Sequence, residues 1–369
     1  MKWKWNFYGI PEVTFGYVTY LLGTNFIAVS SSLAYLIFLY VVRRDRTGVF
    51  DNSFYKIACS LGIPDIVTLV VNLIYLTPAS VLGEANLKFS FIYVLGYIHD
   101  IAFWSVCGHM IVICINRLLA VIFVIEYQQF YRGKRLWFWI LISYSLGLII
   151  PATMWSCTCY YHVPSGWGWE FSCGDRNTTC ANFAMKLNEA LCFGTAAILT
   201  VVHCIIFSRV YVLKRKRMRT LSNCTTIGVT STNARKLSGR REFVMVCQFF
   251  VISLLLTVHV TFFWVVTPKV QSGAVPPSTG MVILHLSVLL NSAVNPYIYL
   301  ICVADGRKAL RAFIAEAILK ISFTEKISHM SLSPLPQSQS PRSDLMDGLR
   351  SPRSNVSRKA GTSLSQMDL

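Results

Sequence analysis

Apolar residues gather in seven long stretches along this chain, and short polar segments separate them. The stretches cover residues 17–42, 57–82, 89–123, 136–160, 187–213, 243–267 and 278–303. Each is at least about twenty residues long, the length that an α-helix needs to cross the hydrocarbon core of a bilayer. The pattern therefore predicts an all-α fold, a seven-transmembrane helix bundle.

The composition and the placement of charge indicate a membrane protein rather than a nucleic-acid-binding one. Of the 369 residues, 54% are hydrophobic and 14% are charged, and the net charge is +17. The Lys and Arg residues cluster beside the apolar stretches on one side, at 43–46, 132–135, 214–219 and 235–241, and are sparse on the other. By the positive-inside rule, we expect a plasma-membrane protein with an extracellular N-terminus and a cytoplasmic C-terminus.

The chain changes character after the seventh stretch. Residues 304–322 place basic side chains between apolar ones at helical spacing, which predicts a short amphipathic cytoplasmic helix in contact with membrane lipids. Residues 323–369 are rich in Ser, Pro and Arg and are expected to form a disordered cytoplasmic tail. The expected organisation is completed by an outer segment, 1–16, and a seven-helix domain, 17–303.

Four of the 12 cysteines lie at or beyond the outer end of the fourth stretch: Cys157, Cys159, Cys173 and Cys180. Because this side is predicted to be oxidising, one or two disulfides are expected among them. Asn177 begins an Asn-Thr-Thr glycosylation site in the same segment.

Polar groups inside the second and seventh stretches require partners. Pro296 should kink the seventh helix, and Asn291, Ser292 and Asn295 can satisfy the backbone groups that the kink releases. Asp65 is the only carboxylate of the second stretch. Because an ionisable group within the membrane is costly, we expect Asp65 to meet these three side chains directly, or through water or a sodium ion. A static network that only holds helices together is the alternative.

These residues resemble the motifs of rhodopsin-like (class A) G-protein-coupled receptors. The segment Asn295-Pro296-Tyr297-Ile298-Tyr299 resembles the NPxxY motif, and Asp65 fits the LxxxD pattern. Arg117 resembles the arginine of the DRY motif, with Asn116 in place of the acid and Tyr127 ten residues later. The resemblance covers residues 17–321. It implies a receptor that binds an extracellular ligand and activates a heterotrimeric G protein, with Arg117 meeting the G protein when the sixth helix swings outward.

The chain also departs from most of that class. Ile92 stands where a bridging cysteine is usual, and the sixth stretch lacks the CWxP motif. The Asn116–Arg117 pair and the aromatic, cysteine-bearing segment 157–171 are similar to nematode serpentine chemoreceptors of the class x type. This resemblance implies neuronal or chemosensory signalling, and a neuropeptide receptor is the alternative. Because Ile92 replaces the usual cysteine, the common bridge of the class cannot form, and disulfides are expected only among the four outer cysteines. Cys173–Cys180, which would close a small loop, is the first choice.

Candidate ligand-binding residues lie in the outer half of the bundle. Asp100 lies roughly 25 Å above Arg117 at about 1.5 Å per residue. His99 precedes it, and His285 lies about three turns above Asn295. These groups could converge on a polar ligand, or Asp100 could only satisfy a buried neighbour. Trp167 and Trp169 could cover the pocket or anchor at the interface. The remaining helical histidines are expected to be satisfied interior residues, with no metal site: His109, His203 and His259.

On the inner side, Glu242 opens the sixth helix and could pair with Arg117 in the resting state. The Ser-rich tail suggests kinases and arrestin as further partners.

No nucleophile with a base, and no cofactor site besides the possible sodium ion, is evident, so an enzyme is not expected. A seven-helix transporter or ligand-gated channel subunit is the alternative from another class. It would need paired intramembrane charges or inverted repeats, and the sequence shows neither.

Overall fold

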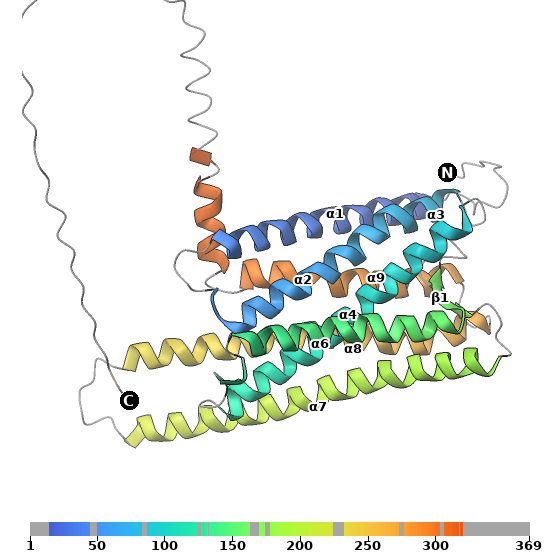
Figure 1. Ribbon diagram of the computed structural model, residues 1–369. Helices are drawn as coiled ribbons and strands as arrows, with labels where there is room; N and C mark the ends of the chain where they lie inside the picture. The colour runs from blue at the N-terminus through green and yellow to red at the C-terminus, as the bar shows by residue number, and fades with distance from the viewer. Residues whose placement is uncertain are drawn as a thin grey trace, which may run out of the picture. The chain divides into compact units, whose positions relative to one another are not determined.

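The structure is a computed structural model. It describes residues 15–44, 50–82, 87–123, 127, 129–131, 133–162, 170–173, 178–223, 232–272, 277–302, 306–316, 318 and 319. Within these residues, seven helices are long and apolar enough to cross a membrane. The helices lie side by side in a bundle (Figure 1), so the predicted all-α, seven-helix fold is confirmed.

The first four membrane helices are α1 (Phe15–Arg44), α2 (Ser53–Val71), α4 (Phe89–Ile122) and α6 (Lys134–Ser156). A π-helical turn (Asn72–Leu76) and α3 (Thr77–Leu82) continue α2. The fifth, sixth and seventh helices are α7 (Thr179–Asn223), α8 (Thr232–Gln271) and α9 (Pro277–Tyr297), and a π-helical segment (Ile298–Cys302) follows α9. A further helix covers residues 306–316.

Regular α-helical bonding ends just after Pro296, where the sequence predicts a kink. The next five residues, Ile298–Cys302, form a π-helical segment. Proline removes a backbone donor and displaces the preceding turn, so a change in hydrogen-bonding pattern here follows from its ring.

The fourth predicted stretch is too long at its C-terminal end. Helix α6 stops at Ser156, and strand β1 (Cys159–His162) pairs antiparallel with β2 (Glu170–Cys173). Thr158, between the end of α6 and the start of β1, has a φ of 57°. This left-handed conformation is rare for a β-branched residue and turns the chain out of the helix. The apolar run could not reveal this turn, because Tyr and Cys suit a strand as well as a helix.

Two disulfides hold the hairpin, and the predicted Cys173–Cys180 pairing is wrong. Cys159 pairs with Cys173, directly opposite it in the register of the two strands, with the Cα atoms 4.0 Å apart. Cys157, just after α6, pairs with Cys180 at the start of α7. One bridge therefore closes the hairpin, and the other ties the fourth membrane helix to the fifth.

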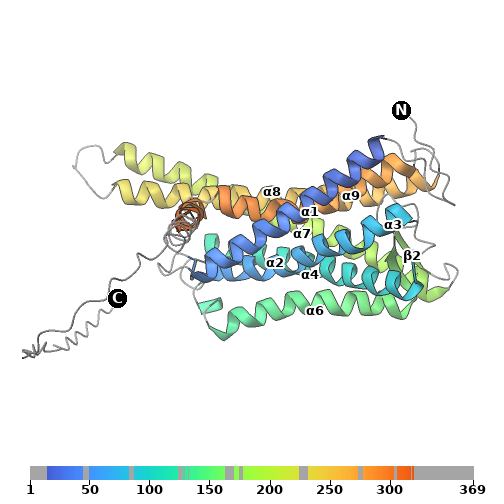
Figure 2. The ribbon, with the colours of Figure 1, turned by 90° about the horizontal axis from the view of Figure 1, so that it is seen from above.

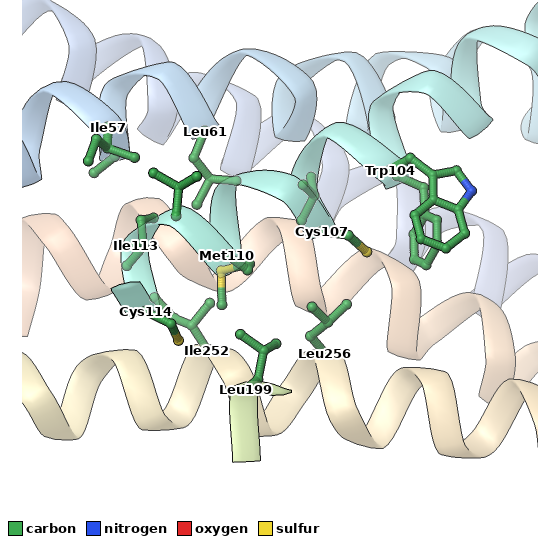
Figure 3. Close-up of a cluster of buried hydrophobic side chains, with 14 of the residues drawn as sticks. Ile57, Leu61, Trp104, Cys107, Met110, Ile113, Cys114, Leu199, Ile252 and Leu256 are labelled. Atoms are coloured by element: carbon green, nitrogen blue, oxygen red, sulfur yellow. The ribbon is translucent and has the colours of Figure 1, made fainter. Parts of the chain in front are cut away.

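Helix α4 forms the centre of the bundle. It packs against α2, α6, α7 and α8, and Figure 2 shows it between α6 on one side and α1 and α9 on the other. Figure 3 shows part of the resulting core. Buried side chains from four helices interdigitate there: Ile57 and Leu61 of α2, Met110 and Ile113 of α4, Leu199 of α7, and Ile252 and Leu256 of α8.

Small residues allow α4 and α6 to approach closely. A Cβ atom added at Gly108 would lie 2.7 Å from the backbone oxygen of Ser143, and one added at Gly147 would lie 1.9 Å from Ser105 Oγ. Both separations are too short for non-bonded atoms. Close backbone approach over Gly and Ser is a common way for membrane helices to pack, because lipid gives no hydrophobic drive for their association.

The two ends of the bundle differ. The β1–β2 hairpin lies at the end where α1 begins, which we call the hairpin end (Figure 1). The helix at 306–316 lies at the other end, the tail end, where Arg44 of α1 forms a 2.9 Å ion pair with Glu316 and the rings of Tyr40 and Phe313 meet edge to face. The chain divides into two units, Met1–Glu316 and Ala317–Leu369, and the features that follow belong to the first.

Candidate functional site

Asp65 in α2 is fully buried and receives hydrogen bonds from two other helices. Asn295 Nδ2 of α9 donates to Asp65 Oδ2 over 2.8 Å, and the Tyr35 hydroxyl of α1 donates to the same oxygen. Ser292 of α9 is buried near the same carboxyl group. A buried carboxylate is costly without such partners. The structure thus brings Asp65, Ser292 and Asn295 together, as the sequence suggests, and adds Tyr35.

Acceptor oxygens remain in this polar cluster after those bonds are made. Asn291 lies buried in α9, one turn before Asn295. Its Oδ1, together with Asp65 Oδ1 and Asn295 Oδ1, has no hydrogen-bond partner within the described part of the chain. The cluster therefore offers more acceptors than donors.

Asn116 at the tail end of α4 is fully buried and bonds outside its own helix. Its Nδ2 donates to Ser53 Oγ of α2 and to the Tyr127 hydroxyl, each over 3.3 Å, and these two hydroxyls are 2.6 Å apart. Asn116 therefore links α4 to α2 and to the segment after α4.

Tyr131 lies in that same segment after α4. Its burial, and to a lesser extent the neighbouring Tyr127, raises the pKa of its phenol, so the group stays neutral at physiological pH.

Arg117, the next residue, lies against aromatic rings from two other helices. Its guanidinium carbon is 3.9 Å from the centre of the Phe54 ring of α2 and 5.5 Å from that of Phe249 of α8. The two rings meet edge to face, with their centroids 4.9 Å apart. The negative face of an aromatic ring attracts a guanidinium, more strongly where water is excluded. We call Phe54, Arg117 and Phe249 the arginine clamp.

Tyr299 extends the aromatic packing of the clamp towards α1. It is buried, stacks on Phe38 with a centroid distance of 5.0 Å, and meets the Phe54 ring at 6.2 Å. Asp65 and Arg117 both lie in its neighbourhood. Tyr299 therefore connects the polar cluster with the arginine clamp.

A small cavity lies in the hairpin-end half of the bundle, between α4, α8 and α9. Its volume is about 20 Å³, and three histidines and four apolar side chains line it: His99, His259, His285, Phe103, Phe263, Leu284 and Val288. His99 and His285 are ligand candidates from the sequence. His259 is expected there only as an interior residue, so the sequence misses its place in the cavity wall.

Two of these histidines bond to neighbouring helices. His285 Nε2 lies 3.1 Å from Asn72 Oδ1, and the Tyr20 hydroxyl of α1 meets His285 Nδ1. His259 Nδ1 of α8 lies 2.8 Å from Ser287 Oγ of α9. Both rings are therefore held in fixed orientations at the wall of the cavity.

Asp100 does not line the cavity, so the expected convergence of Asp100 with His99 and His285 on one ligand is not found. Its carboxyl group is buried near Trp104 and Cys107 of its own helix and Cys192 of α7. Adjacent residues of an α-helix point about 100° apart. His99 and Asp100 consequently face different neighbouring helices.

The other interior histidines have polar neighbours, as expected. His109 Nε2 is 2.9 Å from Ser60 Oγ, and its Nδ1 is 2.7 Å from the Ser105 carbonyl oxygen. His203 Nδ1 is 2.7 Å from the Leu199 carbonyl oxygen. No group of three metal-binding side chains is placed to hold a metal ion among the residues that the structure describes.

Some candidates fall outside the description. Trp167, Trp169 and the glycosylation site at Asn177 lie outside the described residues. The backbone of Glu242 belongs to α8, but its side chain is not described, so its pairing with Arg117 stays a prediction.

Comparison with known proteins agrees with this arrangement. Residues 26–296 match the family model for the serpentine type 7TM GPCR chemoreceptor Srx. No curated protein matches the chain. Among solved structures, squid rhodopsin is similar, with a TM-score of 0.66 and 14% sequence identity over 83% of this chain and 82% of that one. At this identity the likeness shows the fold alone.

The family match spans most of the described bundle and includes the polar cluster, the arginine clamp and the cavity. Together with the seven apolar helices, it indicates a multi-pass plasma-membrane protein. The predicted resemblances to rhodopsin-like receptors and to class x chemoreceptors are confirmed. The chain belongs to the Srx family of serpentine, seven-transmembrane G-protein-coupled chemoreceptors.

Proposed function

We propose that this receptor binds a ligand at the cavity in its hairpin-end half and activates a heterotrimeric G protein at its tail end. In this proposal the hairpin end is extracellular and the tail end is cytoplasmic. The two disulfides at the hairpin end support this orientation, because disulfides form in oxidising compartments. The clusters of Lys and Arg beside the opposite ends of the membrane helices support it independently.

The arginine clamp is the observation that carries the proposal. Arg117 contacts a ring of α2 and a ring of α8, the sixth membrane helix. Moving the tail end of α8 outward would withdraw Phe249 from the guanidinium and open the space beside it. Arg117 would then be available to a protein partner. The clamp thus provides a contact that exists in one arrangement of the helices and is lost in the other.

The polar cluster can transmit a conformational change from the ligand-binding cavity to the arginine clamp. A ligand that shifts α9 would alter the Asn295–Asp65 hydrogen bond. Tyr299 lies four residues after Asn295, in the π-helical segment that continues α9, and its ring meets Phe54 of the clamp. Coupling between the two ends of the bundle requires an element with two stable arrangements. The polar cluster can be that element, because its unused acceptors allow alternative sets of hydrogen bonds.

A sodium ion at the polar cluster remains part of the proposal. Asp65 Oδ1, Asn291 Oδ1 and Asn295 Oδ1 would hold it, since buried oxygen acceptors suit a hard cation. A bound sodium ion would neutralise the negative charge of the buried Asp65 carboxylate. Kinases and arrestin acting on the Ser-rich tail are proposed from the sequence alone.

The test compares the wild type with Arg117→Ala in cells that report G-protein activation, with surface levels matched and a panel of small molecules and peptides applied. Arg209→Ala is the control, because it removes the same charge from an exposed site on α7. We expect a ligand-dependent response that Arg117→Ala abolishes and Arg209→Ala retains. A ligand-evoked current or uptake that persists in Arg117→Ala without G proteins would instead indicate a channel or transporter.

A further inference from the structure

For two of the three histidines that line the cavity, His285 and His259, the hydrogen bonds define which ring nitrogen carries the proton. Asn72 Nδ2 donates to the Thr68 carbonyl oxygen, so Asn72 Oδ1 faces His285 and can only accept. His285 must therefore donate from Nε2 and accept the Tyr20 hydroxyl proton at Nδ1. Both nitrogens of His285 are engaged, and the ring presents only its carbon atoms to a ligand.

His259 is in a different situation. The single hydroxyl proton of Ser287 is donated to the Leu284 carbonyl oxygen over 2.7 Å. Ser287 Oγ can then only accept from His259, so His259 carries its proton on Nδ1. The other nitrogen, Nε2, is left with a lone pair. In a neutral imidazole this nitrogen is a hydrogen-bond acceptor and not a donor.

We propose that the cavity selects small, uncharged ligands that carry a hydroxyl or N–H donor on an apolar body, and that His259 Nε2 accepts that hydrogen bond. The inference rests on the proposed function, since it names the ligand class of the same cavity. Four apolar side chains would contact the body of such a ligand: Phe103, Phe263, Leu284 and Val288. Ser287, which never touches the ligand, is a positioning residue that sets the proton on His259.

The lining disfavours charged ligands. The side chains that line the described cavity include no Asp, Glu, Lys or Arg. A bound ammonium or carboxylate group would lose its hydration without gaining an ion pair, which is a large cost in a buried site. Asp100, the nearby carboxylate in the sequence, is directed towards α7 instead.

The size of the cavity also restricts the ligand. Its volume of about 20 Å³ is close to that of one water-sized sphere. A ligand must therefore displace side chains on entry, and the rings of Phe103 and Phe263 are the largest apolar side chains of the lining.

The test uses purified full-length receptor and measures ligand-induced thermal stabilisation, which does not depend on a G protein. The probes form a matched series on one apolar body: 2-phenylethanol, its methyl ether, 2-phenylethylamine, phenylacetate and ethylbenzene. A second series on a six-carbon chain, from hexanol to hexane, repeats the comparison. We expect each alcohol to bind about tenfold more tightly than its ether, which corresponds to one hydrogen bond. The charged members should bind most weakly.

Two variants then test the role assigned to His259. His259→Leu should reduce the preference for the alcohol over the ether to about onefold while retaining the apolar contacts. Ser287→Ala removes the acceptor that fixes the proton on Nδ1, so His259 can donate from Nε2. Preference should then shift from the alcohol towards the ether, which only accepts. Ser145→Ala is the control, because that hydroxyl bonds only its own helix in α6.

The outcomes separate this inference from the proposed function. Binding by neither alcohol, or a preference for the ammonium or carboxylate member, would overturn the ligand class. An alcohol preference that survives His259→Leu would overturn the role assigned to His259. Arg117-dependent activation by other compounds could still stand in each of these cases. Conversely, selective alcohol binding that produces no G-protein activation would support the ligand class and contradict the proposed function.

Discussion

Replacing Phe249 with leucine should raise the basal activity of the receptor. Phe249 of α8 contacts the guanidinium of Arg117 at 5.5 Å and the Phe54 ring at 4.9 Å. Leucine keeps an apolar side chain at this buried position but removes the aromatic ring. The variant therefore weakens the contact between α8 and the arginine clamp without introducing a polar group into the core.

The two contacts set the size of the effect. A cation–π contact near the limit of its range contributes about 0.5–1 kcal/mol, and an edge-to-face aromatic pair contributes about 0.5–1.5 kcal/mol. If both exist only in the resting arrangement, their loss destabilises that arrangement by about 1–2.5 kcal/mol. The ratio of active to resting receptor should then rise by about fivefold to seventyfold.

The assay is G-protein activation without added ligand, normalised to receptor at the cell surface. Phe250→Leu is the matched control, because the neighbouring ring packs against His203 and Phe207 and not against the clamp. We expect raised basal activity in Phe249→Leu and an unchanged level in Phe250→Leu. Equal or reduced basal activity in Phe249→Leu would refute the reasoning that the clamp holds the resting state.

Three further predictions concern stability and orientation. Tyr35→Phe removes a hydrogen bond to the buried carboxyl group of α2 and should destabilise the purified receptor by about 1–3 kcal/mol, measured by thermal unfolding. Gly147→Leu should strongly reduce surface expression, because the new side chain collides with α4. Gly23→Leu is the control and should not reduce it, since a Cβ atom added at Gly23 has nothing within 4 Å. Cys157→Ser frees the thiol of Cys180, and a membrane-impermeant maleimide should label it on intact cells; labelling only after permeabilisation would reverse the proposed orientation.

The number and type of membrane helices could be predicted from the sequence because each helix must bury its backbone polar groups within one long apolar segment. The polar cluster could be anticipated for a related reason. Asp65 and Asn295 stand out as polar residues within apolar stretches, and a membrane protein carries such groups only with partners. Tyr35 escaped notice, since a tyrosine is common in membrane helices and its partner lies on another helix.

The arginine clamp could not be read from the sequence. Phe54 and Phe249 are apolar residues among many others, and only the packing of α2 and α8 around α4 brings them to Arg117. The proton position on His259 depends in the same way on Ser287, which lies 28 residues further along the chain. Composition and spacing contain no information about such contacts between helices.

The disulfide pairing failed for a different physical reason. A small loop between Cys173 and Cys180 was expected because these cysteines lie close in sequence. The pairing is set instead by the register of a hairpin that places Cys159 opposite Cys173. That hairpin lies partly within a stretch that reads as the end of a helix, so its register could not be anticipated.

The central claim is that Arg117 transmits ligand binding to a G protein. The most direct test is nucleotide exchange on a purified heterotrimeric G protein, with wild-type receptor or Arg117→Ala in lipid discs and a ligand that stabilises both proteins equally. We expect ligand to accelerate exchange only with the wild type. Equal acceleration by Arg117→Ala, or none by either receptor with any of the major classes of G protein, would contradict the central claim.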